Sequence, residues 1–350
     1  MSVTKVLFGT LPGGKAVDCY TLKNQSGARA EILTYGGTLN RLYLPDREGV
    51  LADVLIGFDT LEGHLKYSDY QGMLVGRYAN RIADGAFTLG GDEYHVTKNE
   101  NKTTCLHGGD EFSHAVWDAQ PLGDGALRLV YESPEGAHGF PGRVTARVTY
   151  TLTEENTLRI DYSAVSDQDT ILNLTNHAYF NLAGYDAGEI TGHILRLNAS
   201  QFTPTDARNI PTGELRDVDG TPFDFREPKA IGEGIDSDYA PVASGGGYDH
   251  NFCIDHWDGT LREAGEVYEP ASGRVMQVLT DLPGVQLYTG NFLKGHPGKG
   301  GLPVARRTGF CLETQYYPDT PNQPDFPSCV FHAGEAFEST TEFRFSVRKD

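Results

Sequence analysis

Alternation of apolar and polar residues is the dominant pattern along this chain, and it has the period of β-strands. The stretch VTARVTYTLTEENTLRIDYSAV, residues 144–165, carries it most clearly, with apolar side chains at every second position on both sides of Glu154, Glu155 and Asn156. Because successive side chains of a strand point to opposite faces, this stretch predicts an antiparallel hairpin with one buried and one solvated face. Shorter runs of the same kind predict further strands within residues 28–44, 126–132, 193–199, 274–282 and 341–348.

Helical patterns are scarce. The segment DTLEGHL starts with Asp59 as a candidate N-cap and has Glu62 at the capping-box position, while Gly63 limits the helix to a turn or two. Strands do not alternate with long amphipathic helices, so a parallel α/β sheet is disfavoured. We therefore predict an all-β fold, a large antiparallel β-sandwich with few short helices, in which residues 1–350 form a single domain. Residues 203–247, rich in Pro, Gly and Asp, predict long loops over the sandwich.

Net charge limits the kind of partner that we expect, and the cysteine pattern bears on the redox compartment. The formal net charge of -19 disfavours polyanions, so we expect neither a nucleic acid nor a membrane surface as partner, and a neutral small molecule fits better. No apolar run has the length of a signal peptide or a membrane span. The five cysteines are widely spaced and lack C-x-x-C pairs, which favours reduced thiols in the cytoplasm over disulfides or a zinc knuckle. The chain could be a monomer or a homodimer.

One predicted strand, NLTNHAYFNL at residues 173–182, carries unusual polarity. Alternation would place Asn173, Thr175, His177, Tyr179 and Asn181 on one face and apolar residues on the other. Solvated strand faces usually carry Lys, Glu and Thr, whereas these are neutral hydrogen-bonding groups with short or stiff side chains. The pattern indicates a binding face as readily as a solvated one.

Other short stretches place polar side chains in turns or strands. Asn80 and Arg81 in GRYANRIADG precede a turn, and the guanidinium suits hydroxyl or carboxylate oxygens. On this stretch alone, a surface ion pair is the more common explanation for such an arginine. His107 is followed by two glycines, which allow unusual backbone dihedrals. Asp249 follows three glycines and a tyrosine, and Gln286 shares a strand face with Tyr288.

Glu313 is the least ordinary of the candidates. It lies between Leu312 and Thr314 in an apolar strand that runs into a proline-rich loop. Burial in such surroundings raises the pKa of a carboxyl group toward that of a useful base. The residue is therefore a candidate for acid-base chemistry.

Taken together and in this order, GRYANRI, LHGG, NLTNHAYFNL, YDHNF, PGVQLYTGNFL and LETQYYPDTPNQPDFP resemble the galactose mutarotase (aldose 1-epimerase) family. The resemblance runs nearly end to end, from Tyr35-Gly36-Gly37 to the last predicted strand. It implies a galactose mutarotase-like supersandwich with a sugar cleft on one sheet face. It also implies an enzyme, an isomerase that interconverts the α and β anomers of galactose, glucose and related aldoses.

The resemblance assigns roles position by position. Glu313 matches the family's general base, His177 its general acid and His107 its second active-site histidine. Asn80, Arg81, Asp249 and Gln286, together with His107, match positions that hold sugar hydroxyls. Tyr179, Tyr288 and Phe292 are candidates for an aromatic wall against the sugar. Members of the family commonly have His or Trp after LETQ, where this chain has Tyr316-Tyr317, and we expect that difference at the cleft edge.

Such a reaction needs one base and one acid across the sugar ring, and no cofactor, metal or covalent nucleophile. Ordinary pKa values of about 4.3 for Glu and about 6.5 for His leave the carboxylate ionised and part of the imidazole protonated near neutrality. Modest tuning would then suffice, with Asp249 expected to raise the pKa of the imidazole of His177.

Other classes of function remain open at this point. A non-catalytic sugar-binding module would share the fold without needing Glu313 opposite His177. A glycoside hydrolase would use Asp249 and Glu313, a hexose-6-phosphate 1-epimerase would need more basic residues, and a metal site on His107, His177 and His250 would lack close ligand spacing.

Overall fold

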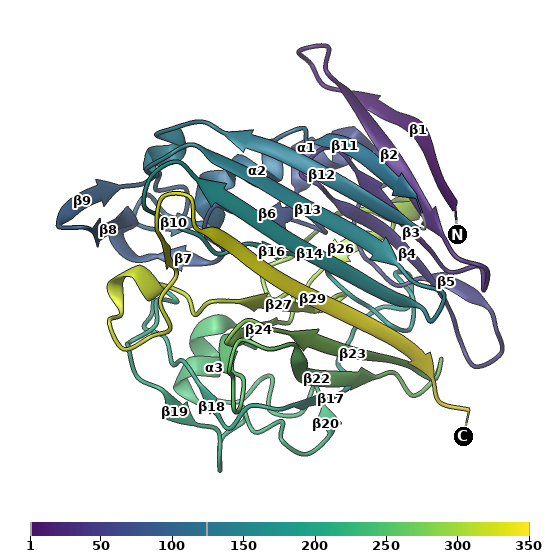
Figure 1. Cartoon of the computed structure of the whole chain (residues 1–350). Coiled ribbons are helices and arrows are strands. Elements are labelled where there is room, and N and C mark those ends of the chain that lie inside the picture. Colours follow the sequence, from purple (N-terminus) through teal and green to yellow (C-terminus); the bar gives the residue numbers. More distant parts are fainter. Residues whose placement is uncertain (1, 124, 350) are drawn as a thin grey trace.

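Antiparallel sheets are the main element of the fold, as the alternating sequence predicts. The structure is a computed structural model that describes residues 2–123 and 125–349. Its largest sheet has nine strands in the order β11-β12-β13-β14-β29-β23-β22-β17-β20. Figure 1 shows β29 (yellow) crossing the molecule between the teal strands and the green strands of this sheet. The strands are β11 Asp118–Gly123, β12 Ala126–Ser133, β13 Val144–Leu152, β14 Thr157–Ser166, β17 Ile194–Leu197, β20 Lys229–Ala230, β22 Arg262–Tyr268, β23 Arg274–Thr280 and β29 Ala336–Val347.

Two five-stranded sheets accompany the nine-stranded one. The N-terminal sheet runs in chain order through β1 Ser2–Thr10, β2 Ala16–Lys23, β3 Arg29–Leu33, β4 Leu39–Pro45 and β5 Leu51–Asp53. The other has the order β19-β18-β21-β24-β27, with β18 Gln201–Phe202, β19 Arg216–Asp217, β21 Asp249–Cys253, β24 Gly284–Tyr288 and β27 Cys311–Gln315. This second small sheet carries most of the site described below.

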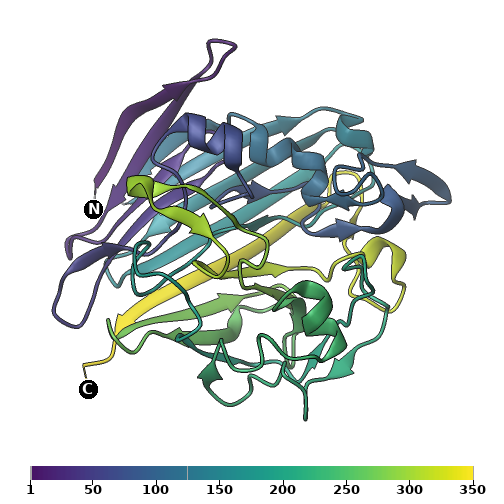
Figure 2. The ribbon, with the colours of Figure 1, turned by 180° about the vertical axis from the view of Figure 1, so that it is seen from behind.

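Short strand pairs and helices complete the described chain. The pairs are β6 Leu74–Val75 with β16 Thr175–Asn176, β7 Arg81–Ile82 with β10 Cys105–Leu106, β8 Ala86–Leu89 with β9 Asp92–His95, β15 Thr170–Ile171 with β28 Val330–Phe331, and β25 Lys294–Pro297 with β26 Pro303–Ala305. The α-helices are α1 Leu61–Tyr67, α2 Glu111–His114 and α3 Ala240–Gly245, and the 3₁₀ turns are η1 Ala83–Gly85, η2 His107–Asp110, η3 Ala137–Gly139, η4 Lys299–Gly301 and η5 Thr320–Asn322. From behind, the hairpin of β25 and β26 and helix α3 lie in front of the large sheet (Figure 2).

The hairpin predicted from residues 144–165 is confirmed. Strands β13 and β14 pair antiparallel with Val148 opposite Tyr162, and the inward residues of β13 are fully or almost fully buried. Their side chains join one hydrophobic cluster with residues of both five-stranded sheets, such as Leu22 and Leu312. The inner face of the nine-stranded sheet thus packs against both small sheets, as expected of a sandwich.

Two local predictions need correction. The N-cap of α1 is Thr60 rather than Asp59, because the Thr60 hydroxyl accepts from the backbone N–H of Gly63 at 3.2 Å. Residues 203–247 are mostly loop, as predicted, but they also contain the short strands β19 and β20 and helix α3.

No helix within residues 2–123 and 125–349 is long and apolar enough to cross a membrane. All five cysteines are buried and free of disulfide bonds.

Candidate active site

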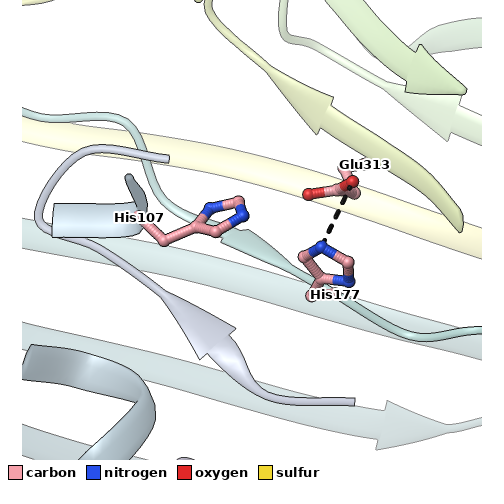
Figure 3. Close-up of side chains that lie close together, drawn as sticks. All are labelled: His107, His177 and Glu313. Carbon is pink, nitrogen blue, oxygen red and sulfur yellow. Dashed lines mark ion pairs between the residues drawn. The ribbon is translucent and has the colours of Figure 1, made fainter. Parts of the chain in front are cut away.

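A cavity of about 580 Å³ collects the chemistry predicted from the sequence. All predicted site residues except Gln286 line it: Asn80, Arg81, His107, His177, Tyr179, Asp249 and Glu313. They come from strands β7, β21 and β27, from the turn η2 and from the segments just before β7 and just after β16. The fold thus brings together positions up to 233 residues apart in the sequence, from Asn80 to Glu313. Figure 3 shows three of them, His107, His177 and Glu313, with their side chains close together.

Glu313 lies in the middle of β27 and is only 2% exposed. Its Oε1 lies 3.6 Å from Nε2 of His177 (Figure 3), and its Oε2 is buried without a hydrogen-bond partner in the described chain. Burial raises the pKa of the Glu313 carboxyl well above its usual value, and the nearby Asp249 carboxylate raises it further while Arg81 opposes them. A buried carboxyl oxygen without a partner is costly, so Oε2 is poised to accept a hydrogen bond from a bound ligand.

His177 follows β16, and its ring lies directly beside Glu313 in the cavity wall. Burial lowers the pKa of its imidazole to about 4. The expectation that Asp249 raises the pKa of this imidazole is wrong, because Asp249 acts on Glu313 instead. The expectation of modest tuning is wrong as well, since burial moves the pKa values of both groups and favours the neutral form of each.

Backbone geometry aims His107 into the same space. The strand pair of β7 and β10 ends at Asn80 and His107, whose φ values of 65° and 53° are left-handed, and the backbone N–H of His107 donates to the Asn80 carbonyl at 3.0 Å. The next residue, Gly108, must lack a side chain because a Cβ there would lie 2.2 Å from the Gly76 carbonyl oxygen. The predicted role of the glycines after His107, to allow unusual dihedrals, is confirmed at this position.

The hydrogen bonding of His107 also defines its tautomer. The backbone N–H of Asn80 donates to Nδ1 at 3.2 Å, so Nδ1 carries no hydrogen, and burial lowers the pKa of the ring well below its usual range. The neutral ring therefore carries its hydrogen on Nε2, as a donor.

That tautomer bears on metal binding. Ligand atoms of His107, His177 and Glu313 lie within 4.8 Å of one another, which is close enough together for the three side chains to hold a metal ion. A metal-binding histidine normally donates its other ring N–H to an acceptor, whereas the other nitrogen of His107 faces a donor. The hydrogen bonding of His107 thus suits a ligand with an acceptor oxygen better than a metal ion. His250, the third histidine considered from the sequence, is fully buried, and its Nε2 is hydrogen-bonded to Thr205.

A polar network holds the remaining predicted residues. Arg81 forms a bidentate ion pair with Glu100, with contacts of 2.9 to 3.2 Å, and its Nη1 lies 3.7 Å from Oδ2 of Asp249. Gln286 is buried behind the cavity and donates to Oδ1 of Asp249 at 2.8 Å. Its own oxygen accepts from Gln315 at 3.1 Å. Gln286 is therefore placed to orient Asp249, without lining the cavity itself.

Aromatic side chains form one wall. Tyr179, Tyr288 and Phe292 line the cavity, and Phe292 is 52% exposed. Tyr70, which sequence reasoning missed, also lines it and packs against both histidines, with ring centroids 4.5 Å from His107 and 5.7 Å from His177. Its hydroxyl donates to Asp110, which lines the cavity too.

The stretch NLTNHAYFNL, predicted as one strand, does not form a regular strand. Within it only Thr175 and Asn176 belong to a strand, β16, which pairs with β6, and residues on both predicted faces are buried. His177 and Tyr179 line the cavity, whereas the Asn173 amide donates to backbone carbonyls of Ala79 and Tyr316 and the Asn181 amide to those of Gly188 and Thr308. The two asparagines thus support the backbone.

Tyr316 and Tyr317 do not line the cavity, so the expectation that they form its edge is wrong. Tyr317 packs edge-on against Phe326, with ring centroids 5.2 Å apart.

Comparison with known proteins identifies the family of the chain. The family model described as Aldose 1-epimerase matches residues 18–344. A rat (Rattus norvegicus) protein called galactose mutarotase is 42% identical over 350 residues, which cover 99% of each chain. An aldose 1-epimerase of Escherichia coli (strain K12) is 34% identical over 339 residues, which cover 95% of this chain and 96% of the relative.

Solved structures agree on the fold. A galactose 1-epimerase from Lactobacillus acidophilus NCFM superposes with a TM-score of 0.86 at 27% identity and covers 99% of both chains. A GalM/aldose epimerase homologue from C. elegans gives 0.85 at 29% identity, covering 93% of this chain and 98% of the other. Fold and site together define an isomerase of the mutarotase type, built on a large antiparallel sandwich. The chain belongs to the aldose 1-epimerase family, whose members act on aldose sugars.

Proposed function

We propose that this chain interconverts the α and β anomers of galactose, glucose and related aldoses, with Glu313 as general base and His177 as general acid. The observation that supports this most strongly is the pair itself. A buried carboxyl group with an unpartnered oxygen faces an imidazole nitrogen 3.6 Å away, inside a cavity of about 580 Å³. Ring opening requires a base at the C1 hydroxyl and an acid at the ring oxygen, and because both oxygens are bonded to C1, a neighbouring base and acid can reach them together.

In the proposed reaction Glu313 removes the proton of the C1 hydroxyl while Nε2 of His177 donates a proton to the ring oxygen. The bond between C1 and the ring oxygen breaks, and its electron pair stays on that oxygen as C1 becomes an aldehyde. Rotation about the C1–C2 bond presents the other carbonyl face. The reverse transfers, from Glu313 to the C1 oxygen and from the C5 hydroxyl to His177, then close the opposite anomer. Proton transfers alone suffice, so no cofactor is needed.

The pKa shifts of Glu313 and His177 indicate how a bound sugar would prepare the two groups for catalysis. The neutral carboxyl with neutral imidazole and the carboxylate with imidazolium carry the same number of protons. One internal transfer converts the first form into the second. A sugar hydroxyl that donates to Oε2 of Glu313 stabilises the carboxylate and favours the second form. Binding would thus create the base and the acid together.

The other polar residues are proposed to hold the sugar. The Nε2–H of His107 can donate to a sugar oxygen, Arg81 and Asn80 offer further donors, and Asp249 accepts from a hydroxyl. Tyr70, Tyr179 and Tyr288 offer apolar faces to the ring. These contacts orient the reacting groups, which is where enzymes of this kind gain much of their rate.

A phosphorylated hexose is a poorer substrate candidate. Arg81 and Lys294 are the basic residues that line the cavity, and Arg81 is already paired with Glu100 and close to Asp249. Asp69, Glu100 and Asp110 line it as well and would repel a phosphate.

The test is polarimetry on freshly dissolved α-galactose and α-glucose, with and without a metal chelator. The proposal expects rotation to change far faster than the spontaneous rate, equally with the chelator. An unchanged spontaneous rate would indicate a sugar-binding module and overturn the proposal, and loss of activity on chelation would overturn its metal-free chemistry. Release of a chromophore from a chromogenic galactoside would instead indicate a glycoside hydrolase.

A further inference from the structure

Cys311 contacts His177, the proposed general acid, on the side of the imidazole away from the cavity. Sγ of Cys311 lies 3.5 Å from Nδ1 of His177, within hydrogen-bond distance for sulfur. Cys311 is fully buried and lies two residues before Glu313 on β27, so both side chains point to the same face of the strand. One strand therefore touches both nitrogens of the same imidazole, with a thiol at Nδ1 and a carboxyl at Nε2.

The proposed reaction limits where the imidazole hydrogens can lie. An imidazolium that donates from Nε2 becomes a neutral ring whose remaining hydrogen is on Nδ1. If Nδ1 were bare in the resting ring, the hydrogen would lie on Nε2, and that atom could not take a proton from Glu313 or from the sugar. Nδ1 must therefore keep its hydrogen through the whole cycle, and that hydrogen needs an acceptor.

We propose that the sulfur of Cys311 is this acceptor, which makes Cys311 a positioning residue that confines proton exchange to Nε2 of His177. The proposal rests on the proposed function, since it assumes that His177 exchanges a proton with the sugar. Burial and the neighbouring carboxylates raise the pKa of the Cys311 thiol well above its usual value, so the group stays a neutral S–H and its sulfur lone pairs remain available.

Sulfur is a weak acceptor, and that suits the acid. A carboxylate at Nδ1 would stabilise the imidazolium and raise its pKa, which would weaken it as a proton donor. A neutral thiol holds the same hydrogen without that charge. Several titratable groups surround the imidazole of His177 in the described chain. They are Cys311 and Glu313 of β27, His107 of η2, Tyr288 of β24, and Tyr70 and Tyr179 of the loops. Of these, Glu313 is the one carboxyl group, and it faces Nε2.

The first test reads the tautomer directly. Long-range ¹H–¹⁵N spectra of protein labelled at its histidines distinguish a ring nitrogen that carries hydrogen from one that does not, and His177→Asn identifies the signals. We expect a protonated Nδ1 and a bare Nε2 in the sugar-free protein near pH 7.5. We expect Cys311→Ala to shift part of the ring population to the other tautomer. A bare Nδ1 in the unsubstituted protein, or a tautomer unaffected by Cys311→Ala, would overturn the proposal.

The second test separates positioning from packing. Cys311→Ala should lower kcat roughly 3- to 10-fold, the scale of one hydrogen bond, with KM little changed. Cys311→Ser restores an acceptor and should recover most of the rate, with the acid limb of the pH profile moved to higher pH. Cys19→Ala removes a buried thiol in β2 that is not among the residues lining the cavity, and should leave the profile unchanged. Equal losses in Cys311→Ala and Cys311→Ser with unmoved profiles would show a packing role and overturn the proposal.

The two proposals fail in different ways. If the unsubstituted protein does not accelerate anomerisation, the proposed function falls whatever the spectra show. If it accelerates anomerisation while Nδ1 is bare, the function stands and the role of Cys311 falls.

Discussion

The hydrogen bond from Gln286 to Asp249 gives a sharp test of how the cavity is organised. Gln286 is 2% exposed and does not line the cavity, yet its Nε2 donates to Oδ1 of Asp249 at 2.8 Å. Gln286→Leu keeps the side chain near its volume and removes this donor. A buried hydrogen bond to a charged group contributes about 1.5–3 kcal/mol, which corresponds to roughly 10- to 150-fold in an equilibrium or rate constant.

We expect kcat/KM for galactose to fall by a factor in that range, because Asp249 would no longer be oriented toward the sugar. The assay is coupled anomerisation kinetics, with the free energy of unfolding measured in parallel. Gln201→Leu is the matched control, since Gln201 donates to Asp217 at 3.0 Å in the same way but at an exposed site outside the cavity lining. A kcat/KM within threefold of the unsubstituted protein in Gln286→Leu would refute the assigned role of Gln286.

Three further predictions follow from named contacts. Glu100→Gln weakens the partly exposed bidentate ion pair with Arg81. It should raise KM about fivefold, which corresponds to roughly 1 kcal/mol, and should change kcat less. An unchanged KM would contradict a role for this ion pair in sugar binding. Because Thr60 caps α1, Thr60→Ala should lower the free energy of unfolding by about 0.5–2 kcal/mol, and Thr60→Ser should lower it by much less. Equal free energies of unfolding for the two variants in urea titrations would contradict the capping role. Burial lowers the pKa of His193 to about 4 while its Nε2 accepts from the N–H of Leu182, so the unfolded chain binds the extra proton below pH of about 6.5. Stability should therefore fall on the order of 1–3 kcal/mol as the pH drops from about 6.5 to about 4, and a His193→Gln variant with an equally steep profile would contradict this cause.

Much of the fold follows from patterns that are local in the sequence. The hairpin of β13 and β14 is readable because one face is buried and the other solvated, so the alternation is strict. The segment around His177 shows the limit of the same reasoning. There residues of both expected faces are buried, and the asparagines bond to backbone carbonyls of distant loops, which no local pattern reveals.

The candidate site was predicted through residues whose type and motif are distinctive, such as His107, His177 and Glu313. Tyr70 and Glu100 were missed because they lie in loops without periodicity, and they reach the cavity only through tertiary contacts with His107 and Arg81. The protonation states could not be predicted either. They depend on the complete burial of a carboxyl and an imidazole facing each other, which sequence spacing does not determine.

Glu313→Gln tests the central claim most directly. The substitution keeps size and hydrogen-bonding capacity but removes the base, so sugar binding by calorimetry and the thermal midpoint should change little. Catalysed anomerisation of fresh α-galactose should fall by about 10²- to 10⁴-fold, the range that a positioned acid or base contributes. A variant that binds galactose and still anomerises it at near the full rate would contradict the assignment of Glu313 as the base.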